Sequence, residues 1–326
     1  MGKILFIRGG AVGDFILTLP AIALAREHLP DAEIEVLGYQ PVIDLARAAG
    51  LVHRGRTIEY GPLSSFFIPN TLLPPELMDY FKSFSVVVSY LYDPDGFFRG
   101  NLERSGVSTL IEGPHKVDES LADQPAAAQL ARPLERLALF LEKPYPELSF
   151  DAASETAAER FLASTPPDSA SRPIQIALHP GSGSPRKNWS LEGWAETAAA
   201  LDRLFPGQVN YLVSSGEAED RTVGDFLDLL RGRNLSFHHA AHLPLPALGA
   251  LLRRCRLFLG HDSGISHLAA ACGLPCLLVF GPTDPDVWAP QNPGVRVIRN
   301  ASGDFAEILA DDVAERAATL LRPGVC

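Results

Sequence analysis

The chain has 326 residues, 46% of them hydrophobic and 21% charged, with a formal net charge of -11 at pH 7. The composition is that of an ordered globular protein, and the length exceeds what one hydrophobic core usually supports, so we expect two domains. The acidic balance excludes a surface built for unspecific binding of nucleic acid or anionic lipid, although it leaves room for a local basic pocket.

The N-terminal region and the cysteines predict a cytoplasmic protein. The apolar run 4–7 is too short for a signal peptide, and no stretch approaches the ~20 apolar residues of a membrane span. The four cysteines form neither a CxxC pair nor a zinc-like spacing, so free thiols in a reducing compartment are expected. Any membrane contact, for example at the inner face of the inner membrane, would then be peripheral.

Short apolar runs alternate with segments of helical periodicity in the first half, which predicts a parallel sheet covered by helices. Pro20 lies inside the first helical segment and predicts a kink or a late start there. Residues 60–82 and 112–150 are longer than usual connections, so they are candidates for functional loops. Strands are predicted at 4–8, 33–37, 56–59, 85–90 and 109–111, and helices at 15–29, 135–141 and 152–163.

The best linker is the run 164–171, which combines turn formers with two prolines. We therefore predict an N-terminal domain over 1–165 and a C-terminal domain over 172–326, whose last helix could pack back on the first domain. The alternation restarts after the linker. Strands are predicted at 174–178, 209–213, 235–238, 257–260, 276–280 and 295–298, and helices at 191–204, 218–230, 245–253, 265–272 and 304–321.

The first glycine-rich loop, residues 9–14, directly follows the first predicted strand. Gly10 and Gly13 would let the backbone approach a ligand on the acceptor side. The spacing is GGxxG rather than GxGxxG, and residues 38–40 offer no clear ribose-binding acid, so a nicotinamide or flavin site is not expected. Asp14 has two interpretations, as a helix N-cap or as a general base.

The second loop, residues 179–190, follows the first strand of the second half. Ser182, Ser184 and Lys187 bring hydroxyls and a cation together with small residues, which suits a phosphate or diphosphate. The alternative is a solvated loop in which Ser190 caps the next helix.

Two further loops follow predicted strands. At 260–267 a strand end meets a helix start, which directs free amides and the positive end of the helix dipole toward a bound anion. His267 could equally be a core histidine. The loop 281–285, which contains Thr283, has the composition of a turn first and of a binding loop second.

These loops resemble the motifs of glycosyltransferase family 9, which includes the ADP-heptose:lipopolysaccharide heptosyltransferases. The matching segments are IRGGAVGD and LTLPAI at 7–14 and 17–22, HPGS and KNW at 179–182 and 187–189, DSGISHLAAA at 262–271, and FGPTDP at 280–285. They occur in the family's order over nearly the whole chain. The resemblance implies an α/β protein of the GT-B fold, with two Rossmann-like domains whose parallel sheets face a central cleft.

The resemblance also implies an inverting transfer that needs no cofactor and no metal. Asp14 would be the base, Lys187 would bind the diphosphate, and Glu219 would lie near the donor ribose. His261 departs from the smaller polar residue that relatives often carry at this position. The residues expected to bind the donor are Ser182, Ser184, Lys187, Glu219, Asp262, Ser263, Gly264, His267 and Thr283.

The leading hypothesis is therefore a heptosyltransferase, or a relative with a related sugar, whose partners are a nucleotide-diphosphate sugar and a glycolipid or glycan acceptor. Chemistry agrees, because inversion needs one base on the acceptor hydroxyl and a stabilised departing diphosphate. Asp311 and Asp312 are interpreted as a solvated helix face rather than metal ligands. Two alternatives are a GT-B transferase with another nucleotide, such as UDP, and a non-catalytic nucleotide-sugar-binding protein.

Overall fold

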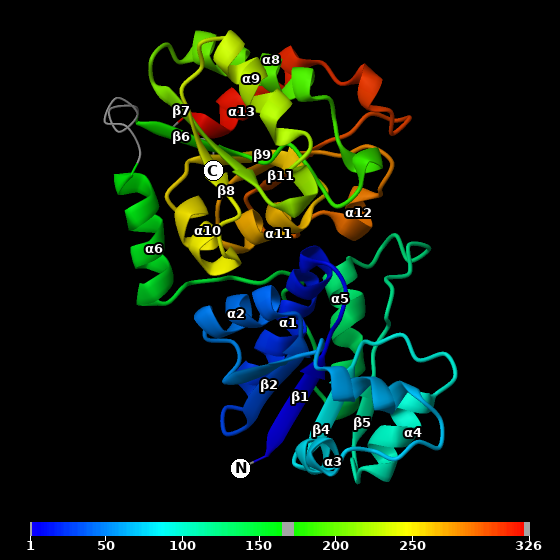
Figure 1. Ribbon diagram of the computed structural model, residues 1–326. Coiled ribbons are helices and arrows are strands. Elements are labelled where there is room, and N and C mark those ends of the chain that lie inside the picture. The colour runs from blue at the N-terminus through cyan, green and yellow to red at the C-terminus, as the bar shows by residue number, and fades with distance from the viewer. Residues whose placement is uncertain (1, 165–172, 323–326) are drawn as a thin grey trace. The chain divides into compact units, whose positions relative to one another are not determined.

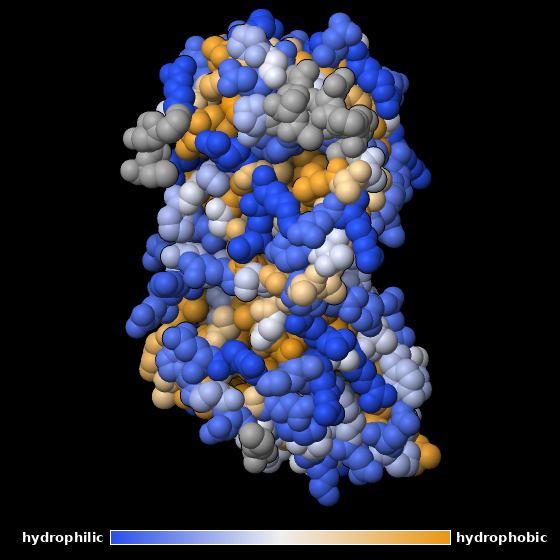
Figure 2. Space-filling model, turned by 90° about the vertical axis from the view of Figure 1, so that its left-hand side faces the viewer, coloured by the Kyte–Doolittle hydropathy of each residue, from blue (hydrophilic) through white to orange (hydrophobic). Residues whose placement is uncertain are grey.

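The computed structural model describes residues 2–164 and 173–322, and contacts divide the chain into two compact units. One unit ends at Pro146 and the other begins at Glu147. Each contains one parallel sheet with helices packed against it (Figure 1). The predicted α/β class with two parallel sheets is therefore confirmed. The face of the molecule in Figure 2 is mostly hydrophilic, with apolar side chains showing in patches.

The first unit is built on a sheet of order β3-β2-β1-β4-β5. The third strand begins two residues before the predicted one, because Arg54 pairs with Glu35 and Thr57 with Gly38. Gly55 is required there, since a Cβ would lie 2.2 Å from Ile43 Cγ2 of helix α2. The strands are β1 (Lys3–Ile7), β2 (Glu33–Gly38), β3 (Arg54–Thr57), β4 (Val86–Ser89) and β5 (Leu110–Glu112).

Helix α1 (Val12–His28) continues through Pro20, so the predicted late start is wrong. Proline inside a helix costs ~3 kcal/mol. Burial of Phe15, Leu19 and Ile22 offsets that cost, because each buried side chain contributes about 1.5–3 kcal/mol. The other helices of this unit are α2 (Gln40–Ala48), η1 (Gly61–Phe67), α3 (Pro75–Lys82), α4 (Phe97–Arg104), α5 (Ala126–Ala131) and η2 (Arg132–Leu137).

The helix predicted at 135–141 is instead the 3-10 helix η2. It ends at Ala138, which adopts a left-handed conformation with φ of 58°. Such a residue terminates a helix, because the carbonyls of the last turn are then capped by the backbone amide that follows. The amide of Ala138 accordingly donates to Glu135 O at 2.9 Å.

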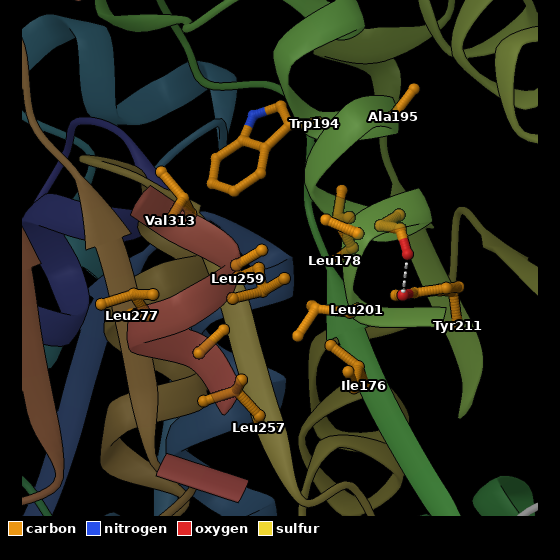
Figure 3. Close-up of a cluster of buried hydrophobic side chains, with 14 of the residues drawn as sticks. Ile176, Leu178, Trp194, Ala195, Leu201, Tyr211, Leu257, Leu259, Leu277 and Val313 are labelled. Carbon is orange, nitrogen blue, oxygen red and sulfur yellow. Dashed lines mark hydrogen bonds between the residues drawn. The ribbon is translucent and has the colours of Figure 1, made fainter. Parts of the chain in front are cut away.

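The second unit is built on a sheet of order β11-β10-β9-β6-β7-β8. Its core joins the sheet to the helices, with Leu178 and Leu259 from the strands clustering with Leu201 of α8 and Val313 of α13 (Figure 3). The buried Tyr211 hydroxyl donates to Ala198 O at 2.7 Å, and this hydrogen bond offsets the loss of its contact with water. The strands are β6 (Ile174–Leu178), β7 (Val209–Ser215), β8 (Phe237–Ala241), β9 (Leu257–His261), β10 (Cys276–Val279) and β11 (Val295–Ile298).

Several predicted elements of this unit differ in extent. The helix predicted at 218–230 is divided into η4 and α9, because the Glu219 carboxylate accepts the amide of Gly216 and closes a separate turn. Strand β8 begins only at Phe237, where pairing with Tyr211 starts. The helices are α6 (Ala152–Ala163), η3 (Pro185–Lys187), α8 (Leu191–Leu204), η4 (Glu217–Glu219), α9 (Val223–Gly232), α10 (Leu245–Leu252), α11 (Gly264–Ala271), α12 (Pro285–Trp288), η5 (Phe305–Glu307) and α13 (Ala310–Leu321).

Helix α6, which the sequence places in the first domain, packs on α10 of the second unit. Arg254, just after the end of α10, forms ion pairs with Glu155 at 2.7 Å and Glu159 at 3.2 Å, both in α6. The division of the chain therefore precedes the expected boundary, whose residues 165–172 lie outside the described parts. The last helix, α13, packs on α8 within the second unit.

Phe150, which precedes α6, packs against helix α10, and this packing can be tested by substitution. Phe150 lies against Gly249, where a Cβ would meet Phe150 Cζ at 2.3 Å. We expect Gly249→Ala to lower the free energy of unfolding by ~1–3 kcal/mol through overpacking, although alanine is the better helix former. Gly224→Ala in α9 is the control, because apart from its chain neighbours and the backbone of its own helix no atom lies within 4 Å of its Cβ position. It should stabilise by ~0.5–1 kcal/mol, and similar denaturation curves for the two variants would contradict the packing argument.

Candidate functional site

Four loops of the second unit leave the carboxyl ends of strands that are neighbours in the sheet. They follow β10, β9, β6 and β7, which are adjacent in that order. Since all these strands are parallel, the loops lie side by side at one edge, where open α/β sheets bind ligands. All the residues predicted to bind the donor lie in these loops or at the start of the helix that follows.

Lys187 and Asp262 form an ion pair at this edge. Lys187 ends η3 after β6, and its Nζ lies 2.7 Å from Oδ2 of Asp262, which follows β9. Asp262 is 6% exposed and the lysine side chain 32%, so the cation also faces solvent. Nζ lies 5.6 Å from the centre of the Trp288 ring as well. An ammonium group has three hydrogens, so this lysine can keep its carboxylate and still bind a further anion.

The loop after β9 leads directly into helix α11. Ser263 is the N-cap, and its Oγ accepts the amide of Ser266 at 3.2 Å. Gly264 is the first helical residue, and His267, in the first turn, is buried. The first turn of a helix has amides without helical partners and carries positive dipole charge, so it favours an anion. Asp262 directly precedes the N-cap in the sequence, and the ion pair holds Lys187 beside Asp262.

Glu219 is buried between the loops that follow β6 and β7. Its Oε2 accepts the amide of Gly216 at 2.9 Å, and its Oε1 lies 3.6 Å from Nε2 of His179. A Cβ on Gly181 would lie 2.4 Å from Glu219 Cγ, so only glycine lets this loop cover the carboxylate. Burial lowers the pKa of His179, while the Glu219 charge opposes that effect. His179 Nδ1 lies 2.9 Å from Ser214 O, which places its proton on that nitrogen.

The hydroxyl of Ser182 is used within its own loop. Its Oγ lies 2.8 Å from Ser184 O and 2.6 Å from Asn188 Oδ1, and a hydroxyl can donate to only one acceptor at a time. The Ser184 amide in turn donates to Ser182 Oγ at 3.3 Å. These contacts hold the segment that leads to Lys187 in a defined shape.

Thr283 follows β10 at the same edge. Within the described parts of the chain, its buried Oγ1 has no hydrogen-bond partner. A hydroxyl that is buried without a partner costs free energy, so its position calls for a function or a ligand. Asp284 caps α12 by accepting the amide of Asp286 at 3.1 Å, so turn chemistry and an unused hydroxyl coexist here.

His261 is a residue that the sequence analysis treated only as a departure from the family. It is fully buried, and its Nε2 accepts both the Trp189 amide at 2.7 Å and Trp194 Nε1 at 2.9 Å. Since both partners are donors, Nε2 is unprotonated and the proton is on Nδ1. The ring therefore joins the end of β9 to the segment that follows Lys187. Only the long-range contact identifies this role.

In the first unit, Asp14 is inside helix α1 and is not its N-cap. It is the third helical residue, and its Oδ2 reaches back to accept the amide of the N-cap, Ala11, at 3.0 Å. The side chain is 37% exposed, and Oδ1 lies 3.6 Å from an Arg8 nitrogen. Gly10 has a φ of 99° and leaves no room for a Cβ, which would lie 2.8 Å from Asp14 Oδ2. Gly13 lies in the same helical turn.

Arg8, which the sequence analysis overlooked, is the buried neighbour of Asp14. It is 4% exposed, and NH1 donates to His115 O at 3.3 Å. Its guanidinium lies over the Tyr90 ring, 5.6 Å from the ring centre. Burial lowers its pKa and the Asp14 charge opposes this, but an arginine stays charged in proteins. A fixed positive charge therefore stands beside the exposed carboxylate.

The described residues offer neither a metal-binding cluster nor a membrane-spanning helix. Among residues 2–164 and 173–322, no group of three or more His, Cys, Asp and Glu side chains is placed to hold a metal ion. Over the same residues, no helix is long and apolar enough to cross a membrane. Asp311 is 83% exposed and lies 3.8 Å from Arg203, as expected for a solvated helix face.

A family model described as glycosyltransferase family 9 (heptosyltransferase) matches residues 115–316, which is more than half of the chain. The chain belongs to glycosyltransferase family 9. It is therefore a glycosyltransferase, and the resemblance noted in the sequence is confirmed.

Individual relatives agree with the family 9 assignment. Lipopolysaccharide heptosyltransferase 3 of Escherichia coli is 23% identical over 318 residues, covering 93% of this chain and 90% of that protein. A family 9 glycosyltransferase from Veillonella parvula superposes with a TM-score of 0.78 at 18% identity, covering 98% and 97% of the two chains. The ADP-heptose lps heptosyltransferase II of E. coli gives 0.73 at 18% identity, covering 98% of each. These superpositions establish the GT-B fold.

Because His261 and His179 are buried, the stability of the fold should depend on pH. Burial lowers the pKa of His261 to about 3, below its usual value of 6.5, so the unfolded chain takes up that proton first as the pH falls. Stability should be complete above pH 6.5 and should decline from there toward pH 3. The decline is at most ~1.4 kcal/mol per pH unit for each such histidine. His179 adds a loss of the same sign.

Two substitutions of His261 test how much of this pH dependence comes from its imidazole ring. His261→Gln keeps an acceptor for the two tryptophan donors but cannot be protonated, so its stability should vary less steeply with pH. His261→Leu leaves both donors buried and unpaired and should lose about 1–3 kcal/mol for each at neutral pH. Urea titrations at several pH values measure both effects. A wild-type slope in His261→Gln would show that another group carries the acid sensitivity.

Proposed function

We propose that this family 9 enzyme transfers a heptose, or a related sugar, from ADP-heptose to a lipopolysaccharide core or another cell-surface glycan. We further propose that the transfer inverts the anomeric centre and requires no metal ion. The observation that carries the donor assignment is the Lys187–Asp262 pair at the start of α11. The names of the E. coli relatives support the sugar, the nucleotide and the acceptor class.

In this proposal the second unit holds the donor. Lys187 and the first amides of α11, after Ser263 and Gly264, bind the diphosphate, because both supply positive charge without a cation. Glu219 accepts a ribose hydroxyl. Its rigid position between two loops gives directional recognition. The remaining donor contacts are assigned to Ser182, Ser184, Asp262, His267 and Thr283.

The first unit supplies the base. The acceptor hydroxyl gives its proton to Asp14, and its oxygen forms a bond to the anomeric carbon while the bond from that carbon to the diphosphate breaks. The electron pair leaves with the diphosphate, where Lys187 and the α11 amides stabilise it. A single displacement of this kind inverts the anomeric centre. Asp14 suits the task because Oδ2 is held by Ala11 and the carboxylate is still exposed.

The acceptor-side loop provides for a close approach of substrate to Asp14. Gly10 and Gly13 place no bulky side chains beside the carboxylate. A glycolipid acceptor would bring the enzyme to the inner face of the inner membrane, and this location stays a prediction.

Removal of the Lys187 charge tests the donor site. Lys187→Ala should weaken ADP binding by tenfold or more, the scale of a charged hydrogen bond of about 1.5–3 kcal/mol, and should leave adenosine binding almost unchanged. Arg186→Ala is the matched control, because it removes an equal charge from the exposed neighbouring position. Isothermal titration of both variants gives the comparison. Equal losses for ADP and adenosine, or a wild type that prefers UDP or GDP, would reject this donor assignment.

The two roles of Asp14 are separated by two substitutions. Asp14→Asn keeps an oxygen for the Ala11 amide, so the fold and donor affinity should persist while single-turnover transfer falls by about 10² or more. Asp14→Ala should also lose roughly 1 kcal/mol of stability with the cap. Rates are measured with ADP-heptose in excess EDTA, where the wild type should be fully active. A near-normal rate in Asp14→Asn would exclude it as the base, and dependence on magnesium would contradict the proposed site.

A further inference from the structure

A long uncharged segment in the first unit is not used by the proposed transfer. Residues 60–75 contain no Asp, Glu, Lys, Arg or His, although about three charged residues would be expected at the chain's average of 21%. This segment, called here the uncharged loop, includes η1 and the connection to α3. Three of its apolar side chains face solvent: Phe67 is 41% exposed, Ile68 51% and Leu72 92%.

The uncharged loop is held firmly, so its exposed side chains do not result from a loose conformation. Asn101 Nδ2 donates to Phe66 O at 2.8 Å and to Ile68 O at 3.1 Å. Arg104 donates to Thr71 O at 3.1 Å. These bonds come from helix α4 and hold the backbone on both sides of Phe67 and directly before Leu72.

Buried side chains also anchor the uncharged loop to the core of the first unit. Leu63, Phe66 and Leu73 belong to the core of the first unit, and the Phe67 ring stacks on Phe98 with centroids 4.8 Å apart. The fold thus fixes a rigid loop that presents apolar groups to water. Such an arrangement is unfavourable in isolation, because it leaves apolar surface in water, and apolar groups that the fold holds exposed are candidates for an interaction site.

The size of the exposed group favours a lipid surface over a second protein. A stable protein interface buries about 800 Å² on each partner. Such an interface takes about 20–30 residues from each partner, so three side chains, two of them already about half covered, fall short of it. A membrane interface has no such requirement, because each apolar side chain that enters it contributes independently.

The charges around the uncharged loop indicate how it would bind. The exposed Arg104 stands at its edge, anchored to Thr71 O and Asn101 Oδ1, and can reach a lipid phosphate. Glu76, at the other end, lies 3.6 Å from Arg56, which reduces its repulsion of phosphate. With a net charge of -11, the protein gains little from general attraction to an anionic membrane.

We propose that the uncharged loop docks this enzyme on a lipid bilayer by inserting Phe67, Ile68 and Leu72 into the interfacial region. Apolar insertion, rather than charge, then provides the affinity, and Arg104 contacts a headgroup phosphate. The proposed docking adds a lipid bilayer to the partners of the enzyme. It does not depend on the assignment of the donor or of the base.

The test is flotation of the full chain with phosphatidylcholine vesicles that contain no glycolipid. The wild type should float with the vesicles, and raising the salt concentration should change the bound fraction little. Ile68→Gln and Leu72→Gln should each reduce lipid affinity by about tenfold, the scale of one removed apolar side chain. Leu309→Gln is the matched control, since Leu309 is 60% exposed in the second unit, and it should bind as the wild type does.

Three results would overturn the proposal: no flotation of the wild type, equal flotation of all variants, or release by moderate salt. Loop variants that abolish a concentration-dependent dimer, with no vesicle binding by any form, would assign the loop to self-association instead. Transfer to a water-soluble acceptor should be the same in the wild type and loop variants. A failure of transfer with normal flotation would count against the proposed function alone.

Discussion

The parallel pairing of β6 with β9 is the constraint on which the second unit's site depends. It aligns Ile176 with Leu257 and Leu178 with Leu259, so β6 ends beside the last residues of β9, which continues to His261 at the same edge of the sheet. The next backbone bond, from the His179 amide to Leu259 O at 3.0 Å, extends this register into the loops. Lys187 and Asp262, 75 residues apart in sequence, meet as a consequence. Their ion pair forms because β6 and β9 are neighbours in the sheet.

Buried polar groups then give the edge its rigidity. His261 and His179 are both kept neutral by burial, and each has one nitrogen committed to a defined partner. Glu219 is equally committed, to the amide of Gly216. These defined partners hold the loops in one conformation, although Nδ1 of His261 has no hydrogen-bond partner within the described residues, and the burial makes the fold sensitive to acid. A site for a diphosphate benefits, because prepositioned donors need no reorganisation when charge develops.

In the first unit one residue, Asp14, caps a helix and is also the base of the proposed reaction. Asp14 closes the first turn of α1 with one oxygen and remains exposed, next to the buried Arg8. The sequence offers cap and base as alternative roles for Asp14, and the geometry permits both. The cap is formed by reaching back from the third helical position, which explains why an N-cap prediction misplaced it. A rigid carboxylate is also what a general base requires.

Local patterns in the sequence were sufficient for the approximate place of the strands, for α1 and the longer helices of the second unit, for the α/β class and for the loops that follow strands, because periodicity and turn chemistry act over a few residues. They also carried the family motifs. Helices α2, α3, α4 and α5 of the first unit were not predicted. The extent of β3 and β8, the interruption of the helix at 218–230 and the place of α6 depended on partners such as Glu35, Tyr211 and Phe150. The role of His261 depended on Trp189, 72 residues away. Such contacts form only once strand order and helix docking are set, since distant residues meet through packing that no short window of sequence contains.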